Sequence, residues 1–481
     1  MFFSTVSICK KLARDKDRPC REESGTALPV LTAKDQKNRS TNFMSPRRVL
    51  LLTAVIWANQ MSSELRAQEA VSTTADSGTA MSSIAGSPSG TTAPPTGVTS
   101  STGGPAVETA PSGPGAFSPT PVQIYATVSG GYDDNVNTGI GSQKQASPYT
   151  NGNAILAYAF GNPRLQLNLN AGAGGTYYYE HISGQNYDVD FKGAFGITYK
   201  STPRLTLGCT LLVEYLTEPS FDYAGGLNSR NGNYLYTTDK VFVDYAWSRR
   251  FSTKTSETFE AYNYDNDAVG MFSNRVTNIL GNEFRFQLVP TTTLVAEYRY
   301  TIVSYENGSL DSTTHTALGG FDHIFNPRLR TSIRGGAEFR SYDNDGERNG
   351  PYFEGTTSYA FGRRTSISWS TRYGLEEPDV PTAQSRTTFR TGLQTKFNFT
   401  SRIASTVDLY YVHDDFHPLQ SGPVVSTAFS DDTFDGGVTL RYNITPLIGV
   451  QVGYHYTDVN SDVGQREYSR NRVFGGANVT F

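Results

Sequence analysis

The sharpest two-residue alternation in this chain is Leu329-Arg330-Thr331-Ser332-Ile333-Arg334-Gly335-Gly336-Ala337-Glu338-Phe339-Arg340. Arginine and glutamate occupy even positions, whereas leucine, isoleucine, alanine and phenylalanine occupy odd ones. Successive side chains of a β-strand point to opposite faces, so the segment predicts a strand with one charged and one apolar face. Strands of ~10 residues with that division are typical of membrane barrels, whereas soluble strands are usually nearer five or six residues.

The same pattern recurs along the chain, for example over residues 447–456, and the composition agrees with it. The 481 residues are 37% hydrophobic and 12% aromatic with a mean hydropathy of -0.42. That is too polar for a bundle of membrane helices and too aromatic for a disordered chain. A net charge of -4 supplies no dense basic face, so no nucleic-acid partner is expected.

An export signal is predicted near the start of the chain. The apolar run at 49–58 follows Pro46-Arg47-Arg48 and precedes Leu65-Arg66-Ala67, which gives a basic region, a short apolar core and a small residue at the exit. The run is about half of the ~20 apolar residues that a spanning helix needs. We therefore expect cleavage after Ala67 rather than a retained anchor.

The rest of the chain divides by composition. Ser, Thr, Gly, Ala and Pro dominate the stretch before residue 121, which buries too little apolar surface to offset its ordering entropy. A folded plug would need a core pattern that this stretch lacks, and Cys209, alone in the body, predicts no internal disulfide. The expected organisation is an extended or unused upstream segment at 1–43, a signal peptide at 44–67, a disordered periplasmic linker at 68–120 and an outer-membrane β-barrel at 121–481.

A short turn recurs every ~40 residues, the length of one hairpin with its loop. Pro with Gly or Asn presets the backbone for a tight reversal, so these are interpreted as the short periplasmic turns of a barrel. The clearest are Gly161-Asn162-Pro163-Arg164-Leu165, Ser201-Thr202-Pro203-Arg204-Leu205 and Asn326-Pro327-Arg328-Leu329. Looser versions are Ser248-Arg249-Arg250-Phe251, Val289-Pro290-Thr291-Thr292, Gly362-Arg363-Arg364-Thr365, Thr400-Ser401-Arg402-Ile403 and Thr445-Pro446-Leu447.

Longer polar segments, such as the one at 265–273, separate these turns and are expected to be extracellular loops. Together they predict an all-β, transmembrane, antiparallel up-and-down β-barrel of about 18 strands with both termini in the periplasm. Several strands end in tyrosine followed by an acid, which predicts an aromatic girdle beneath an acidic rim. These pairs are Tyr132-Asp133, Tyr179-Glu180, Tyr264-Asp265, Tyr305-Glu306 and Tyr342-Asp343.

The chain ends on an alternating strand with a terminal aromatic. Val473, Val479 and Phe481 share one face, and this arrangement resembles the C-terminal signal by which outer-membrane barrels are recognised for insertion. We expect these three residues to act as an assembly signal for the barrel-assembly machinery, with the aromatic side chain on the lipid face.

Residues that would carry chemistry are not gathered in this sequence. The six histidines have no metal-ligand spacing, and no Ser/His/Asp set can be assembled from neighbouring residues. Asp343-Asn344-Asp345-Gly346 is similar to part of a calcium loop but lacks the downstream glutamate, and Gly172-Ala173-Gly174-Gly175 lies inside a strand pattern rather than at a strand-to-helix turn. We therefore expect no enzyme, no metal and no cofactor.

Charged residues at predicted inward positions are the candidate functional residues. So many charges could not be buried in a dry core, but a barrel of about eighteen strands is wide enough for water. The alternative is a lumen closed by ion pairs across the barrel and by infolded loops. The predicted pore-lining residues are Arg285, Glu297, Arg299, Arg330, Arg334, Glu338, Arg340, Arg390, Lys396 and Arg441.

The first predicted strand carries the segment Val128-Ser129-Gly130-Gly131-Tyr132-Asp133-Asp134-Asn135-Val136. It resembles the opening of the family called putative β-barrel porin 2, in which a similar Tyr-Asp-Asp-Asn-Val follows the signal peptide. The resemblance implies an outer-membrane channel, with some relatives associated with exopolysaccharide export, and it supplies no catalytic residues.

Three functions are therefore weighed for this chain. The first is a passive channel for small hydrophilic solutes through a charged aqueous lumen, and the others are an accessory barrel of exopolysaccharide secretion and a structural or surface-binding barrel without an open pore. The expected surroundings are the lipid and lipopolysaccharide of a Gram-negative outer membrane. Homo-oligomerisation is left open by the sequence.

Overall fold

The computed structural model describes residues 122–180, 186–217, 230, 232–308, 310–343, 346–362, 364–419 and 427–481. The predictions made for residues 1–120 lie outside these ranges. Within them, no helix combines the length and the apolar character needed to cross a membrane.

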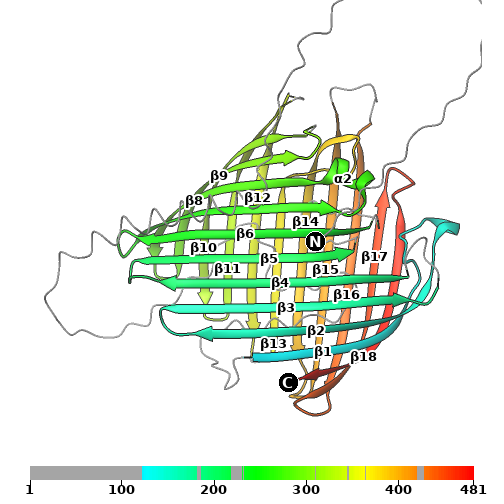
Figure 1. Ribbon diagram of the computed structural model, residues 1–481. Coiled ribbons are helices and arrows are strands. Elements are labelled where there is room, and N and C mark those ends of the chain that lie inside the picture. The colour runs from blue at the N-terminus through cyan, green and yellow to red at the C-terminus, as the bar shows by residue number, and fades with distance from the viewer. Residues whose placement is uncertain are drawn as a thin grey trace, which may run out of the picture. The chain divides into compact units, whose positions relative to one another are not determined.

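Eighteen antiparallel strands form one closed sheet (Figure 1). Each strand pairs with its neighbours in sequence, and β1 also pairs with β18, so the predicted up-and-down barrel of about 18 strands is confirmed. The strands are β1 (Val122–Asp133), β2 (Ser147–Gly161), β3 (Leu165–Tyr178), β4 (Tyr187–Lys200), β5 (Leu205–Thr217), β6 (Asn233–Ala246), β7 (Phe251–Tyr264), β8 (Arg275–Val289), β9 (Thr292–Tyr305), β10 (Ser312–Asn326), β11 (Leu329–Tyr342), β12 (Gly346–Phe361), β13 (Thr365–Glu376), β14 (Ala383–Asn398), β15 (Ile403–Pro418), β16 (Phe429–Asn443), β17 (Ile448–Ser461) and β18 (Tyr468–Thr480).

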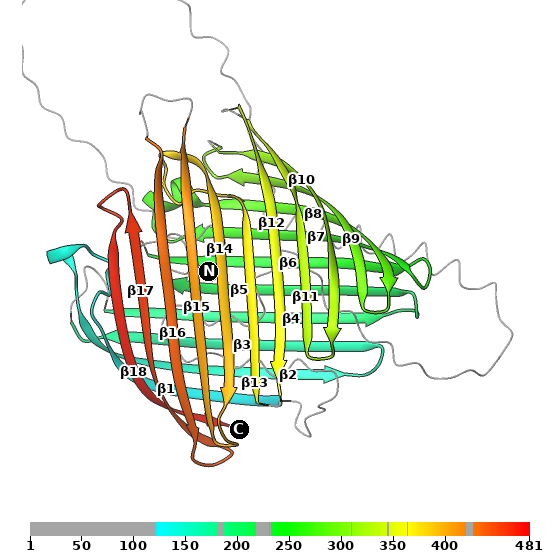
Figure 2. The same ribbon diagram turned by 180° about the vertical axis from the view of Figure 1, so that it is seen from behind.

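The strands are strongly tilted relative to the barrel axis. In Figures 1 and 2 the wall formed by β2 to β8 crosses the opposite wall, β11 to β16, at a steep angle. Closing a sheet requires such a tilt, and alternate side chains then face the lumen and the lipid. Along β8, for example, Phe284 and Phe286 point outward and are exposed, whereas Glu283 points to the opposite, inner face and is buried.

All eight predicted short turns connect consecutive strands, and together they define one end of the barrel, here called the turn end. Six of them share a side-chain cap. The Asn162 Oδ1 accepts hydrogen bonds from the backbone N–H groups of Arg164 and Leu165, at 2.9 and 2.8 Å. The equivalent caps are Thr202, Ser248, Asn326, Thr400 and Thr445. A local side-chain acceptor therefore fixes these turns, in addition to the proline that sequence reasoning credited.

The opposite end, here called the loop end, carries the longer connections. Residues 265–273 were expected to form a plain polar loop, but the helix α2 (Asp267–Ser273) occupies most of them, with Asn266 as its N-cap. A second short helix, η1 (Gly141–Gln143), lies between β1 and β2. Asn and Asp compete for backbone N–H groups, which explains a short capped helix in a segment rich in them.

The predicted aromatic girdle is only partly correct. Tyr132 and Tyr179 face outward and are exposed, as expected. Tyr264, Tyr305 and Tyr342 are instead buried on the inner face, because they are in register with other inward residues of their strands. The loop end therefore has an internal aromatic layer in addition to outward tyrosines.

The seam of the barrel closes at the last residue of the chain. The Phe481 N–H donates to the Ile124 carbonyl at 2.8 Å, and the Ile124 N–H donates to the Phe481 carbonyl at 3.1 Å. Val473 and Phe481 face outward, and the Phe481 side chain is 71% exposed. The first and last strands of the barrel thus begin and end at the turn end.

Candidate channel lumen

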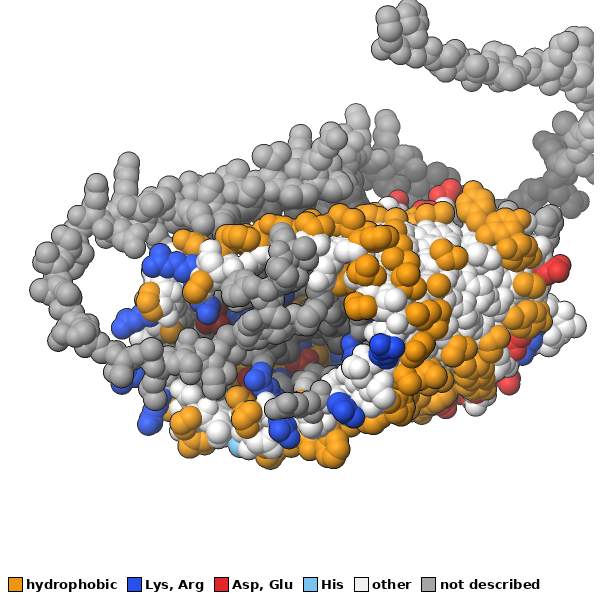
Figure 3. All heavy atoms as spheres, turned by 90° about the horizontal axis from the view of Figure 1, so that it is seen from below, with side chains coloured by type: hydrophobic (Ala, Val, Ile, Leu, Met, Phe, Trp, Pro, Cys, Tyr) orange, Lys and Arg blue, Asp and Glu red, His pale blue; other side chains and the backbone are white. Residues whose placement is uncertain are grey.

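The ten predicted pore-lining residues lie on the inner face of β8, β9, β11, β14 and β16. Each is flanked in its strand by outward residues, such as Tyr298 between Glu297 and Arg299. Figure 3 views the barrel obliquely from the turn end, with apolar side chains over the outer wall and a hollow that contains charged side chains. The structure therefore gathers these residues around one internal surface.

Arg299 of β9 belongs to a network that crosses two intervening strands. Its guanidinium lies 2.6 Å from the Glu297 carboxylate, 2.8 Å from the Glu354 carboxylate of β12 and 3.1 Å from the Tyr352 hydroxyl. Tyr352 in turn donates to Glu354 at 2.6 Å. Burial of these charged groups would be costly without partners, and the charge-assisted hydrogen bonds supply those partners. The bonds also connect the inner faces of β9 and β12.

Three other predicted arginines are paired with acids that sequence reasoning did not connect to them. Arg285 is 2.8 Å from both Asp244 of β6 and Glu283 of β8. Arg334 is 2.8 Å from Asp322 of β10 and only 1% exposed. A further arginine, Arg390, lies 3.5 Å from Glu376 of β13.

The segment between β13 and β14, residues 377–382 and here called the inward segment, is bound from two sides of the loop end. Glu377 accepts hydrogen bonds from the Tyr305 hydroxyl of β9 at 2.6 Å and from Arg340 of β11 at 2.9 Å. The Glu338 carboxylate accepts from the backbone N–H of Leu375, just before the segment, at 2.8 Å. Of the predicted site residues, Arg340 therefore binds this segment, and Glu338 binds the end of β13 that leads into it.

The other side of the inward segment is held by the connection between β17 and β18. The Arg466 guanidinium lies 2.8 Å from Asp379 of the segment and 2.7 Å from Asp431 of β16. Burial lowers the pKa of Arg466, but the two carboxylates outweigh it and hold that pKa above its ordinary value. Asp379 and Arg466 were not predicted, because nothing local in sequence indicates that two loops meet.

Exposure of the inner face changes along the barrel axis. On β3 the inward residues Gln166 and Asn168 near the turn end are exposed, whereas Thr176 and Tyr178 near the loop end are buried. On β11 the inward Arg330 is exposed and Arg340 is buried. Lys396 and Arg441 lie close to the turn end and are half-buried. On these strands the inner surface is accessible near the turn end and buried near the loop end, whereas on β7 the inward Lys254 is already buried four residues into the strand.

Aromatic rings contribute to the packing near the loop end. Tyr234, Tyr236, Tyr262 and Tyr264 form one buried cluster on β6 and β7. The Arg275 guanidinium of β8 stacks on the Tyr262 ring, with 4.0 Å between its carbon and the ring centroid. Cation–π contact and ring burial both stabilise this part of the inner wall. Counting in steps of two along β6 and β7 would have placed these tyrosines on the inner face from the sequence.

The opening motif of the barrel acts at the β1–β18 seam. Asp133, 1% exposed, accepts hydrogen bonds from Arg470 of β18, the Arg470 Nε donor lying 2.9 Å away. Asp134 accepts from the Asn471 backbone N–H at 2.6 Å, and the Asn135 amide donates to the Ser469 carbonyl at 2.9 Å. Three consecutive residues of the motif therefore join the first strand to the last.

These features define a membrane β-barrel: a closed antiparallel sheet, an apolar outside and a charged inside. Residues 122–481 match the family described as putative beta-barrel porin 2, and the chain belongs to that family. The family resemblance carried by the Tyr-Asp-Asp-Asn-Val segment is thereby confirmed. Porin membership supports an outer-membrane barrel that takes part in transport.

Comparison with solved structures gives matches at low sequence identity and low TM-score. OccAB4 of Acinetobacter baumannii is 10% identical with a TM-score of 0.38, over 75% of this chain and 99% of that chain. OpdK of Pseudomonas aeruginosa, solved with vanillate, is 11% identical with a TM-score of 0.39, over 75% and 99%. The siderophore receptor PirA of A. baumannii is 6% identical with a TM-score of 0.39, over 75% and 80%. A search of curated proteins gave no match.

Proposed function

We propose that this protein is a channel of the Gram-negative outer membrane for passive diffusion of small hydrophilic solutes. The observation that carries this proposal is the polar inner face, whose side chains are accessible near the turn end of several strands and buried near the loop end. A vestibule followed by a constriction is how a wide barrel can pass small solutes and exclude large ones. The ion pairs near the loop end narrow the path, and the exposed Arg330 lies in the wider part.

The proposed placement follows from how such barrels are built. Short turns face the periplasm and long loops the outside, so the turn end and both ends of the barrel sequence would be periplasmic. Val473, Val479 and Phe481 are the proposed contact for the barrel-assembly machinery, and outer-membrane phospholipid and lipopolysaccharide would surround the wall. An accessory role in exopolysaccharide secretion is the second candidate. It is favoured by the basic residues of the turn end, which would attract an acidic polymer.

Purified, refolded protein should give stepwise currents in a planar lipid bilayer. A matched preparation in which the same detergent carries no protein controls for leakage. Absence of current at every voltage, from barrels shown to be folded by their resistance to detergent denaturation, would exclude the channel and leave the structural or surface-binding barrel.

Replacing Arg330, Lys396 and Arg441 together by glutamine should shift the reversal potential in a salt gradient toward cation preference. These residues lie in the accessible part of the inner face, where a charge changes the local concentration of permeating ions. The matched control is Arg249→Gln, in an exposed turn. An unchanged reversal potential in the triple variant would mean that the three residues do not line the path.

The outer wall supports a further proposal, that the barrel associates with a second copy of itself. Asp239 and Glu257 are each the seventh residue of a fourteen-residue strand, and both are at outward register. Among the described strands, the remaining outward acids, such as Asp415 and Asp432, lie near the loop end. Carboxylates in the middle of a lipid-facing wall are destabilising unless another protein covers them.

Amide side chains beside these acids could bind the carboxylates of a second copy of the chain placed against the same wall. Asn278 and Asn282 of β8 share the outward face with Glu257, and Thr255 donates to Asn282 at 3.4 Å. A two-fold interface brings one patch against itself, so amide donors of one copy meet carboxylate acceptors of the other. Polar side chains of this kind hold membrane segments together.

Chemical cross-linking in native membranes should therefore yield a dimer or a larger homo-oligomer. The variant Asp239→Leu/Glu257→Leu should lower the cross-linked fraction, whereas Val241→Leu in the same wall should not. A wild-type chain that migrates only as a monomer, or an unchanged cross-linked fraction in the double variant, would contradict the proposed self-association.

A further inference from the structure

Arginine occupies the same structural position in six of the eight short turns. This position is recognised by a backbone hydrogen bond in which its carbonyl accepts from an N–H near the end of the next strand but one, the strand that pairs with the strand following the turn, at 2.7 or 2.8 Å. The donors that mark it are Lys200, Ala246, Gln287, Ile324, Ala360, Asn398, Asn443 and Thr480. The residues at the position are Arg164, Arg204, Arg250, Thr291, Arg328, Arg364, Arg402 and Leu447.

Register places this ring of arginines at the mouth of the lumen. Each one immediately precedes the first outward residue of an ascending strand, such as Leu165 after Arg164 and Phe251 after Arg250. Its backbone therefore has the register of the inner face. All six side chains are exposed, and Figure 3 shows Lys and Arg side chains around the rim of the hollow.

Other charges at the turn end reinforce the ring rather than neutralise it. Arg330, Lys396 and Arg441 lie near the turn-proximal ends of their strands, as does Lys200. Among the described residues that lie within four positions of a quoted turn, Asp244 and Asp322 are the acids, and they form ion pairs with Arg285 and Arg334. Successive ring positions are two strands apart, about 10 Å along the sheet, so at the physiological Debye length of about 8 Å the potentials of neighbouring charges overlap only in part.

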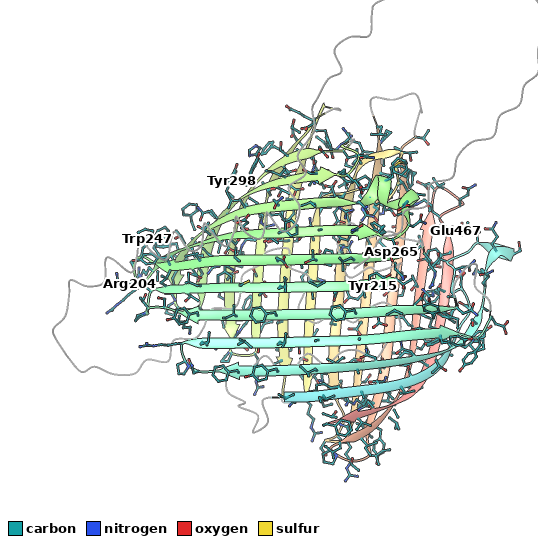
Figure 4. The ribbon with its side chains drawn as sticks, viewed as in Figure 1. Arg204, Tyr215, Trp247, Asp265, Tyr298 and Glu467 are labelled. Carbon is teal, nitrogen blue, oxygen red and sulfur yellow. The ribbon has the colours of Figure 1, made fainter. Side chains whose placement is uncertain are left out.

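The loop end is rich in acidic residues, whereas the turn end is rich in basic ones. The described connections and strand ends of the loop end carry many acids, including Asp134, Asp265, Asp311, Asp462 and Glu467. Figure 4 shows the two ends in one view, with Arg204 and Trp247 at one end of the strands and Asp265 and Glu467 at the other. The barrel is therefore electrically polar along its axis.

We propose that the arginine ring at the turn end is a capture site for anionic solutes, with anionic polymers the strongest ligands, and that it admits them from the turn end in preference to the loop end. The proposal rests on the proposed channel function and adds its substrate class and direction. Guanidinium groups bind carboxylate and phosphate oxygens, and a polymer can meet several of them at once. A mouth lined by one sign of charge concentrates counter-ions and speeds their association.

The experiment measures current block by a polyanion added to one side of a single inserted channel. Polygalacturonate is the polymer probe and inorganic phosphate the small-anion probe, which separates a polymer site from a site for any anion. Biotin attached at Glu467→Cys, followed by streptavidin, reports which side carries the loop end. The ring variant replaces all six arginines by glutamine, and Arg249→Gln is the matched control because it lies in a turn but outside the ring position.

We expect polygalacturonate to block from the turn end with an association rate roughly 10-fold or more above that from the loop end. The ring variant should lose this asymmetry, the control should keep it, and 1 M salt should abolish it. Equal block from both ends, or asymmetry that survives in the ring variant, would overturn the proposal. If phosphate blocks the channel as strongly as polygalacturonate does, the ring binds small anions, and the proposed preference for polymers is wrong.

A separate readout keeps the capture site distinguishable from the channel. If no current is seen, binding of fluorescent polygalacturonate to folded barrels in detergent is compared between the wild type and the ring variant. Binding that the ring variant weakens at least several-fold retains the capture site while the channel fails. Equal binding by the two proteins overturns the capture site as well.

Discussion

Removal of the Asp133 carboxylate by Asp133→Ala should destabilise the barrel by about 3–5 kcal/mol, because it leaves the buried Arg470 guanidinium without its partner. The two side chains are almost fully buried at the seam, where β1 and β18 are the most distant strands in sequence. No short turn connects them, so their pairing closes a loop that contains the whole barrel sequence. The measurement is urea unfolding of the refolded barrel in lipid vesicles, followed by tryptophan fluorescence.

A double-mutant cycle separates the ion pair from general damage at the seam. Arg470→Leu alone should be costly for the same reason, whereas Asp133→Leu/Arg470→Leu should lose less than the sum of the two single changes. Asp462→Asn, at an exposed loop position, is the matched control and should leave the transition unchanged. Additive losses from the two single variants would show that Asp133 and Arg470 do not stabilise one another.

The architecture could be predicted because it depends on local patterns. Two-residue alternation fixes the faces of each strand, and a turn needs only a few consecutive residues with a suitable cap. Arg334 was therefore placed on the inner face from its own strand alone. Its partner Asp322 was not identified, because a pairing between β10 and β11 depends on register that the alternation does not specify.

The aromatic girdle was partly wrong for a different reason. Tyr305 was assigned by the acid that follows it, although counting in steps of two from Arg299 reaches Tyr305 and predicts an inward ring. The same count from Arg340 reaches Tyr342. The alternation within a strand therefore predicted the direction of a tyrosine side chain better than the acid that follows it did.

The inward segment was beyond prediction because its contacts join parts of the chain far apart in sequence. Glu377 and Tyr305 are 72 positions apart, and Arg466 and Asp379 are 87 apart. Each partner lies in or beside a polar loop whose composition is unremarkable. A barrel brings such loops to one end, so meetings among them follow from closure of the sheet rather than from any short motif.

Freeing the inward segment should widen the channel. In Glu377→Gln/Asp379→Asn the segment loses the charge on its bonds to Arg340 and Arg466, each a charge-assisted contact in a buried setting. A charge-assisted hydrogen bond contributes about 1.5–3 kcal/mol, so losing either of the two contacts would raise the population of a displaced segment by roughly 10- to 100-fold. Single-channel recordings should therefore show a larger mean conductance, with more frequent transitions to the high level.

The control for this variant is again an acid-to-amide change at the loop end. Asp462→Asn alters a carboxylate that accepts hydrogen bonds from Ser430 on the outside of the same region, and it should leave the conductance unchanged. If Glu377→Gln/Asp379→Asn has the wild-type conductance and the wild-type pattern of transitions while remaining folded, the inward segment does not limit the flow. The constriction would then lie deeper, at the Arg299 network of β9 and β12, and Glu354→Gln would be the change expected to widen the path.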